Sequence, residues 1–489
     1  MLQPLEQFRA KTKRLQIHPV ERSVLCLVAL HLVFLPWALG GVRTWAQVIS
    51  LGLGALAFVV ALLPRTYTAD HTGAAEFRLI PWPKLLRFPL FWLGGALIAL
   101  VIVQACNPGW SYRSNELGWW MERIDSVRWL PAGVTAPFEK GGQGSALLVL
   151  VSAWLTVCTV WVGFTRRRSL QVLLLILAGN GLALALLGLA QRMMGNGKIF
   201  WFYESPNPVF FSSFTYKNFA GSYLLLPLAL TCGLAAWYYL RGLRRLEKSN
   251  PSGVLAFFAT CVGVSVLTSY ARGATLTMLA FLLLCVGAFV VHQIYLPKEN
   301  RKPLVALCMV AIFGFFLKTG LTALNSRLAW SKIEQAVAEG DSSMEARSQA
   351  TIAASEMLGE HWVRGVGAGS FRFLFPLYQH RHPELKALNP EGGAFWINAH
   401  NDLLQFPIEY GAAGVLIFLA GLGWCGISLC RCYFWENPLS ATGVLICSLM
   451  LVYGRWEFLF QCPAVLITWS VVWVIALQWA RFEESGAKG

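Results

Sequence analysis

The sequence predicts an all-α polytopic membrane protein, because most of the chain is apolar and its apolar residues form long runs. Of the 489 residues, 56% are hydrophobic and 13% are charged, and the mean hydropathy is +0.54. A soluble protein of this length could not bury so much apolar surface. Runs long enough to cross about 30 Å of hydrocarbon recur along the chain and predict roughly twelve transmembrane helices. The predicted spans are 23–40, 45–63, 89–106, 145–164, 169–191, 218–240, 253–270, 274–292, 304–320, 411–430, 440–457 and 463–480.

Lys and Arg gather in alternate loops between the predicted spans, which predicts that these loops lie in the cytoplasm. The basic groups lie at 9–22, 65–87, 166–168, 241–248 and 298–302. Both termini are then cytoplasmic, and because no small-residue cleavage site follows the first span, we expect no cleavable signal peptide. The net charge of +15 reflects these loops and contacts with anionic lipid, rather than nucleic-acid binding.

Two long polar segments then lie on the outer side of the membrane. Segment 107–144 contains four Trp residues, which either form an aromatic belt at the lipid headgroups or a platform on which sugars stack. Segment 321–402 is a large insert, and Ser342–Glu345 has the pattern of a capping box that opens a helix within it. We interpret Gly365–Gly369 as a turn that allows close packing. The predicted organisation is a cytoplasmic N-terminus (1–22), about nine transmembrane helices (23–320), the outer catalytic insert (321–402), about three transmembrane helices (403–480) and a cytoplasmic tail (481–489).

A polar group begins at His400, where the insert enters the membrane. In a helix that starts here, Asn401, Gln405 and Glu409 repeat every four residues and form one stripe, with Asp402 near the same side. A lone His is more often a structural residue, but polar side chains at a lipid boundary usually face a cavity. We therefore predict that His400 is a general base, that Glu409 orients or tunes it, and that the other three side chains support it.

Basic side chains are predicted on the same outer side as His400. Arg272 interrupts two apolar spans, and it either reaches lipid phosphates or offers a planar fork of donors to a diphosphate. Arg347 follows the capping box, with a solvated helix face as the alternative. Lys217 and Asn218 open a span, and a helix N-terminus with a Lys favours anions. Because no metal-ligand spacing accompanies these residues, we predict chemistry without a metal or cofactor.

Three stretches together resemble the bacterial O-antigen ligase/O-antigen polymerase superfamily of membrane glycan transferases. They are 214–221 (F-x-x-K-N-F-A-G), 269–274 (S-Y-A-R-G-A) and 400–411 after the large insert, and 365–378 is similar to the family's G-x-G…F…Y segment. The resemblance covers roughly residues 210–430. Two motifs depart from the family, because the usual S-R-G-G is A-R-G-A here and Lys-Asn replaces an Asn/Arg-Asn-His pattern.

The resemblance implies a GT-C-like helical fold in the bacterial inner membrane, with its active site facing the periplasm. It implies a glycan donor on undecaprenyl diphosphate, a catalytic His at His400, and diphosphate-binding arginines at Arg272 and Arg347. The implied reaction is a metal-independent inverting displacement in the synthesis of lipopolysaccharide O-antigen or exopolysaccharide.

The acceptor stays open among a lipid A core (ligase), a growing lipid-linked glycan (polymerase) and a protein. The alternative from another class is a transporter or flippase of lipid-linked glycans. It is disfavoured because the charges cluster in outer loops and no internal repeat is evident.

Overall fold

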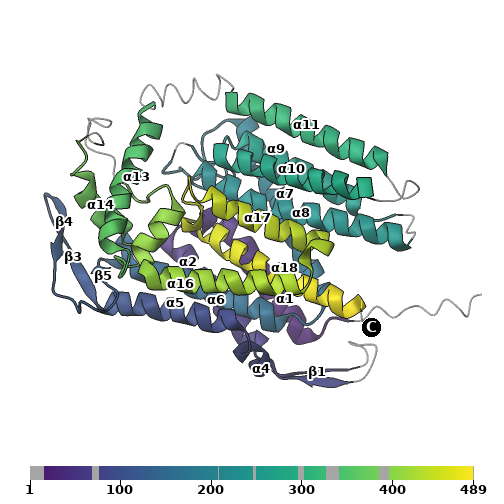
Figure 1. The fold of residues 1–489 in the computed structure, drawn as a ribbon, viewed down its shortest axis with the longest axis horizontal. Coiled ribbons are helices and arrows are strands. Elements are labelled where there is room, and N and C mark those ends of the chain that lie inside the picture. The colour runs from purple at the N-terminus through teal and green to yellow at the C-terminus, as the bar shows by residue number, and fades with distance from the viewer. Residues whose placement is uncertain are drawn as a thin grey trace, which may run out of the picture.

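The structure is a computed structural model, and it describes residues 16–68, 76–207, 209–245, 249–295, 302–325, 341–383, 385 and 396–487. Long apolar helices dominate these residues and confirm the predicted all-α polytopic fold (Figure 1). Ten of the described helices are long and apolar enough to cross a membrane, and α9 and α17 are shorter apolar helices. The bounds of these twelve apolar helices are α1 Pro19–Trp37, α2 Thr44–Ala61, α5 Pro89–Cys106, α6 Gln143–Gly163, α7 Arg167–Met194, α8 Lys217–Arg245, α9 Ser252–Thr268, α10 Arg272–Tyr295, α11 Pro303–Asn325, α16 Asp402–Arg431, α17 Pro438–Tyr453 and α18 Pro463–Ala487.

Short elements connect these helices. A two-stranded antiparallel sheet pairs β1 with β2, and a three-stranded sheet has the order β4-β3-β5. The short elements are η2 Leu39–Gly41, β1 Arg65–Tyr67, β2 Phe77–Leu79, α4 Pro81–Leu86, β3 Pro108–Asn115, β4 Gly118–Arg123, β5 Gly133–Thr135, η3 Phe138–Lys140, α14 Phe371–Gln379, η5 Phe434–Glu436 and η6 Leu459–Gln461. A further helix, α13 Asp341–His361, is longer, with 21 residues.

The main core lies between the long helices, with α8 and α18 at its centre. In each of these two helices 83% of the apolar window is buried inside the protein, against 11% in α5 and 12% in α11. Helices α5 and α11 accordingly lie at opposite edges of the bundle in Figure 1. Burial on all sides explains why α8 and α18 carry large apolar side chains around their whole circumference.

The two predicted sides of the membrane correspond to two opposite ends of the bundle. At one end, Tyr67 Oη donates to Glu21 Oε2 at 2.7 Å and Arg167 Nη1 lies 2.6 Å from Glu483 Oε1. At the other end, the amide of Asp402 donates to Gly454 O at 2.7 Å. The described parts of the basic loops therefore lie at one end of the bundle, and the described parts of the polar segments lie at the other; positions 9–15, 246–248 and 298–301 of the predicted basic loops lie outside the described residues. That the second face is the outer one stays a prediction. Helix α18 continues to Ala487, so the described part of the predicted tail is helical.

A second core joins the two outer polar segments. Segment 107–144 forms the strands β3, β4 and β5, and this sheet lies beside α13 and α14 (Figure 1). No strands were predicted in this segment from the sequence. Val134 of β5 is buried with Met357 of α13 and Phe371 of α14, and Trp110 packs against them. Trp110 therefore contributes to a protein core, whereas Trp129 is 80% exposed.

The glycine-rich turn between α13 and α14 is confirmed as a site of close packing. Gly365, Gly367 and Gly369 have φ angles of 72°, 100° and 69°, which side chains rarely tolerate. The amide of Gly367 donates to Glu409 O at 3.0 Å, so this turn binds the backbone of α16. Helix α13 is also confirmed, although the side chains of its predicted capping box, 342–345, lie outside the described ones.

We expect Gly365→Ala to lower the stability of the folded protein by about 1–3 kcal/mol, because the backbone is left-handed there. A Cβ atom would also lie 2.4 Å from Glu409 O. Thermal unfolding of the purified protein in detergent measures this. The matched control is Gly359→Ala in α13, where a Cβ meets nothing within 4 Å and the change should be neutral or stabilising. Equal melting temperatures for the two variants would contradict the expectation.

Candidate functional site

His400 lies on the short segment that leads into α16, at the mouth of a cavity. Its φ angle of 50° is unusual for a residue with a side chain, so its neighbours must hold it in place. Trp396 and Phe458 contact the imidazole edge to face, with ring centroids at 5.5 Å and 4.5 Å. The ring is therefore fixed between two aromatic side chains, and its side chain keeps 22% of its surface exposed.

Glu457 is the acidic neighbour of this imidazole. His400 Nδ1 is buried and lies 3.3 Å from Glu457 Oε1, although the contact falls short of hydrogen-bond geometry. The Glu457 side chain also accepts hydrogen bonds from Asn218 Nδ2 and from the amide of Phe458. Only 3% of Glu457 is exposed, so these donors and the imidazole, rather than water, surround its carboxylate. Glu457 was not singled out from the sequence. Its position as an acidic residue in a short loop between two apolar spans could have indicated it.

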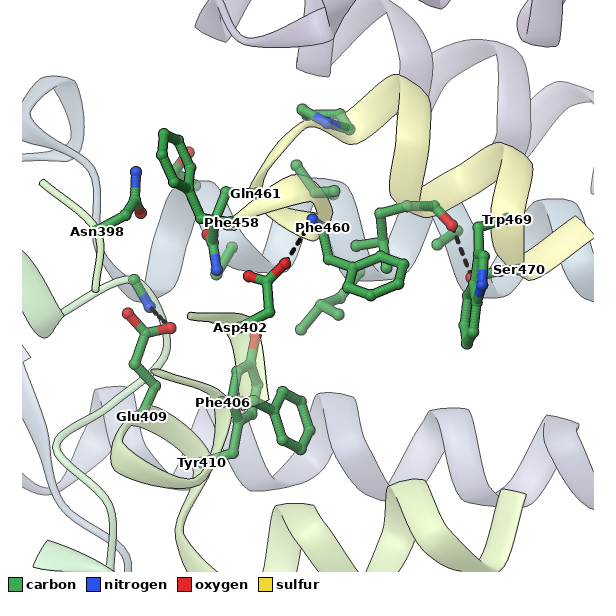
Figure 2. Close-up of a pocket in the computed structure, with 18 of the residues that line it drawn as sticks. Asn398, Asp402, Phe406, Glu409, Tyr410, Phe458, Phe460, Gln461, Trp469 and Ser470 are labelled. Atoms are coloured by element: carbon green, nitrogen blue, oxygen red, sulfur yellow. Dashed lines mark hydrogen bonds between the residues drawn. The ribbon is translucent and has the colours of Figure 1, made fainter. Parts of the chain in front are cut away.

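The residues predicted to support His400 hold the start of α16. Asn401 is the N-cap, and its side chain accepts from the amide of Leu404 at 3.2 Å. Asp402 accepts from the amide of Phe460 at 2.9 Å (Figure 2). Gln405 accepts from the amide of Ala399 at 2.9 Å. The Asp402 bond attaches the His400 segment to the loop between α17 and α18, which carries Glu457, and the other two bonds hold the segment against the first turn of α16.

Glu409 is placed with the glycine-rich turn rather than beside the imidazole. Its carboxylate accepts from the amide of Gly369 at 3.0 Å, from the amide of Phe371 at 3.3 Å, and from Gln405 Nε2 at 3.0 Å. Only 2% of the residue is exposed. Two members of the predicted stripe, Gln405 and Glu409, are therefore hydrogen-bonded to each other. Because Gln405 also binds the amide of Ala399, Glu409 can position the His400 segment through Gln405. The backbone of α16 stays helical past Pro407 and breaks at Gly411, where φ is 65°.

The predicted cationic residues gather around Tyr216. Lys217 and Arg272 are the first residues of α8 and α10, and Lys217 lies within electrostatic reach of Arg272 and Arg347. Burial and the Glu457 carboxylate raise the pKa of Tyr216, and the positive charge of Arg347, with its hydrogen bond to the hydroxyl, opposes that rise. Asn218 Nδ2 donates to the same hydroxyl at 2.7 Å. The structure thus brings together all four predicted diphosphate-binding residues.

Arg192 joins this group and was not predicted. Its guanidinium lies 4.9 Å from the centre of the Tyr270 ring, and it is within electrostatic reach of Lys217. Arg192 lies in the last turn of α7. A basic residue is common at that position of a helix, so the sequence did not indicate a role in the site.

Two motif glycines let the helices of this site approach each other. A Cβ on Gly221 would lie 2.8 Å from the Cβ atoms of Ala271 and Ala274. A Cβ on Gly273 would lie 2.1 Å from the ring of Tyr453. The motifs at 214–221 and 269–274 are therefore in direct contact, and each needs a residue without a side chain at that point.

A cavity of about 1300 Å³ opens beside His400. Asn398, Asp402 and Gln461 lie at its polar end, and Phe460 and Trp469 lie further along it (Figure 2). It continues between α5, α6, α16 and α18, and its lining along α6 from Ser145 to Val157 corresponds to about 18 Å of helix. Its apolar lining includes Leu97, Val149, Phe418 and Leu422. This shape suits an amphiphile with a polar head beside the imidazole and a long apolar tail.

Potential metal ligands are scattered over the described part of the chain. No three His, Cys, Asp or Glu side chains gather there as a metal site.

These features define a multi-pass membrane protein with an amphiphilic cavity and a His–Glu pair at the cavity's polar end. Residues 254–419 match the family model Wzy_C, whose description is O-Antigen ligase. The chain therefore carries the ligase domain of the O-antigen ligase/polymerase superfamily, which confirms the resemblance seen in the motifs. Its function is of the O-antigen ligase/polymerase type, which is glycosyltransferase-like and implies lipid-linked glycan and acceptor substrates. No curated protein matches the chain.

The matched range contains some of the candidate residues and leaves out others. Arg272, Arg347, His400 and Glu409 lie inside it. The Lys217–Asn218 pair and Glu457 lie outside it, on segments that the fold brings to the same place.

We expect Glu409→Ala to destabilise the protein by about 1–3 kcal/mol, because two buried amides lose their acceptor. Glu409→Gln keeps one carbonyl oxygen and should retain part of the stability. Melting temperatures in detergent compare both variants with Glu116→Gln in the outer β-hairpin, an exposed residue whose change should leave the melting temperature unaltered. A melting temperature of Glu409→Ala equal to that of the wild type would show that the turn does not need this carboxylate.

Proposed function

We propose that this protein transfers a glycan from undecaprenyl diphosphate to an acceptor hydroxyl, by a metal-independent inverting displacement at the periplasmic face of the bacterial inner membrane. The observation that carries the proposal is the placement of His400. Its imidazole lines the amphiphilic cavity, its Nδ1 faces Glu457, and a group of cations lies near the adjoining Tyr216 and Lys217.

His400 supplies the general base in this mechanism. With the Nδ1 proton directed at Glu457, the Nε2 atom carries the free lone pair. The acceptor hydroxyl gives its proton to Nε2 as its oxygen attacks the anomeric carbon. The Glu457 carboxylate stabilises the imidazolium that forms and holds the ring in the required orientation, as the acid of a catalytic triad does.

The cations around Tyr216 act on the leaving group. The bond between the anomeric carbon and the diphosphate oxygen breaks, and its electron pair stays with undecaprenyl diphosphate. Arg272 and Arg347 offer planar donor forks, and Lys217 adds a point charge, which together neutralise the departing diphosphate. Attack opposite to the leaving group inverts the anomeric configuration. The proton on His400 is then released to solvent.

The donor's chemistry also fits the membrane setting of the site. A prenyl diphosphate keeps its tail in the bilayer and its charged group at the interface, where the cation-bearing helix ends lie. The basic loops at the opposite end of the bundle support a cytoplasmic location for that end. Such a transferase acts in the synthesis of a cell-surface polysaccharide, either lipopolysaccharide O-antigen or an exopolysaccharide.

The acceptor decides between ligase, polymerase and protein transferase. Purified protein is incubated with a lipid-diphosphate glycan together with a lipid A core, or with the lipid-linked glycan alone. Glycan moved to the lipid A core identifies a ligase, and a ladder of products on the lipid carrier identifies a polymerase. Movement of the lipid-linked glycan across sealed vesicles without a new glycosidic bond would replace the transferase proposal with a flippase.

We expect His400→Ala to lower the transfer rate by roughly 10²–10⁴-fold, because the acceptor hydroxyl loses its base. Initial rates are measured with purified protein, lipid-diphosphate glycan and acceptor in detergent. The control is His292→Ala at the opposite end of α10, an exposed His whose loss should leave the rate unchanged. A His400→Ala enzyme as fast as the wild type would rule out the base.

We expect Glu457→Gln to lower kcat by roughly 10–100-fold with little change in the donor KM, because the imidazolium loses its partner only as it forms. Glu457→Asp should recover part of kcat, since it keeps the carboxylate. Glu436→Gln, an exposed acid at the opposite end of the bundle, is the control. A higher donor KM at unchanged kcat would assign Glu457 to substrate binding instead.

A further inference from the structure

Three basic side chains from separate elements line the cavity. They are Arg43, which precedes α2, Lys140 at the end of η3, and Arg372 of α14. Arg372 lies within the stretch 365–378 but at none of its Gly, Phe or Tyr positions, and Arg43 and Lys140 lie outside the matched range 254–419.

Contacts place this second group of cations around the N-terminus of α6. Arg372 Nη1 donates to Lys140 O at 3.0 Å, so these two residues are neighbours. Arg43 lies one helical turn before Gln47 of α2, and Gln47 Oε1 accepts from Ser145 Oγ of α6 at 3.0 Å. The partial positive charge at the start of α6 adds to the charges of the three side chains.

The second group is not neutralised within the described part of the chain. Arg43 Nη2 donates to Tyr203 Oη at 3.3 Å, and no ion pair within 4.0 Å is found there for any of the three side chains. Burial lowers the pKa of Arg372, and the Glu409 carboxylate acts in the opposite direction. A guanidinium that is partly withdrawn from water without an ion-pair partner is stabilised by an incoming anion.

Three acidic residues also line the cavity, and their positions matter for its charge. Glu409 and Asp402 are buried, and their oxygens accept from backbone amides of Gly369, Phe371 and Phe460. Glu139 is exposed and precedes Lys140 in the chain. The two buried carboxylates are thus already engaged with the protein backbone, which leaves the cations available to a ligand.

An aromatic layer lines the cavity next to His400. The rings of Tyr216 and Phe458 stack at 5.5 Å, and Phe219 meets Phe458 edge to face at 5.3 Å. All three rings line the cavity, whereas Lys217, Arg272 and Arg347 are not among its described lining residues. His400 lies against Phe458.

We propose that Arg43, Lys140 and Arg372 form a binding site for an anionic group, a phosphate or a carboxylate, carried by a lipid-linked acceptor whose tail occupies the apolar part of the cavity. This inference rests on the proposed transfer reaction. An inverting displacement needs the acceptor and the leaving group on opposite sides of the anomeric carbon. A group of cations in the cavity beside the general base, distinct from the group that contains Lys217 and Arg272, would give the acceptor a binding place of its own.

Binding is measured first, without any transfer reaction, by native mass spectrometry of the purified full chain in a neutral detergent. The probes are hexadecyl phosphate and its uncharged match, hexadecyl glucoside. The wild type should bind the phosphate at least about tenfold more tightly than the glucoside. In the triple variant Arg43→Gln/Lys140→Gln/Arg372→Gln this preference should disappear, while His400→Ala and the outer-hairpin control Arg113→Gln should keep it.

A preference for the phosphate that survives in the triple variant would overturn the site. If that preference is instead lost in Lys217→Gln/Arg272→Gln, the anion lies with the first group of cations. A triple variant whose melting temperature falls is replaced by the single variant Arg43→Gln, which removes an exposed side chain.

Steady-state kinetics then separate acceptor from donor. Arg43→Gln should raise the acceptor KM about tenfold and leave the donor KM unchanged. A rise in the donor KM alone would overturn the assignment, since the cavity would then hold the donor. If no form of the protein transfers glycan, the proposed function fails, and the binding comparison still decides whether an anion site exists.

Discussion

The buried Glu457 carboxylate connects the parts of the chain on which the site depends. It accepts from Asn218 at the start of α8 and from the amide of Phe458, and it faces the imidazole of His400. A charged group at the end of a membrane-spanning bundle is expensive unless protein groups surround it. The same contacts that satisfy this carboxylate therefore fix the relative positions of α8, of the loop between α17 and α18, and of the segment that enters α16.

The outer insert is attached to the bundle at several points and forms a firm support for His400. Glu409 and Gln405 bind the glycine-rich turn to the start of α16. Arg364, just before that turn, donates to Leu130 O at 2.8 Å and to Val127 O at 2.9 Å, which binds the insert to segment 107–144. A general base must be placed accurately to act. These attachments help to hold His400 in its unusual backbone conformation.

The aromatic side chains around His400 lie where two polar regions approach the imidazole. In one region Lys217, the first residue of α8, lies within electrostatic reach of Arg272 of α10 and Arg347 of α13, and Arg347 acts on the hydroxyl of Tyr216. In the other region the cavity leads from Asn398 and Asp402 into an apolar channel between the helices. A reaction that joins two lipid-linked substrates needs two such regions with one base between them, and exclusion of water by the rings strengthens every charge interaction near the imidazole.

The sequence by itself determined the membrane class, the order of the long helices and the superfamily. Each of these depends on local information, either hydropathy over one span or a short motif such as S-Y-A-R-G-A at 269–274. The turn at Gly365–Gly369 was predictable for the same reason, since glycines at alternate positions indicate special backbone angles wherever they occur.

Only the tertiary structure decided which residues meet. The hairpin of β3 and β4 is local in the chain, but its packing against α13 and α14, which completes the second core, joins segments more distant than any local pattern extends. Helical periodicity placed Glu409 on a stripe with Gln405, but it carries no information about whether the carboxylate turns to an imidazole or to backbone amides. Glu457 becomes a neighbour of His400 because α17 and α18 return the chain to the outer face, and contacts between distant segments are set by the packing of the whole bundle.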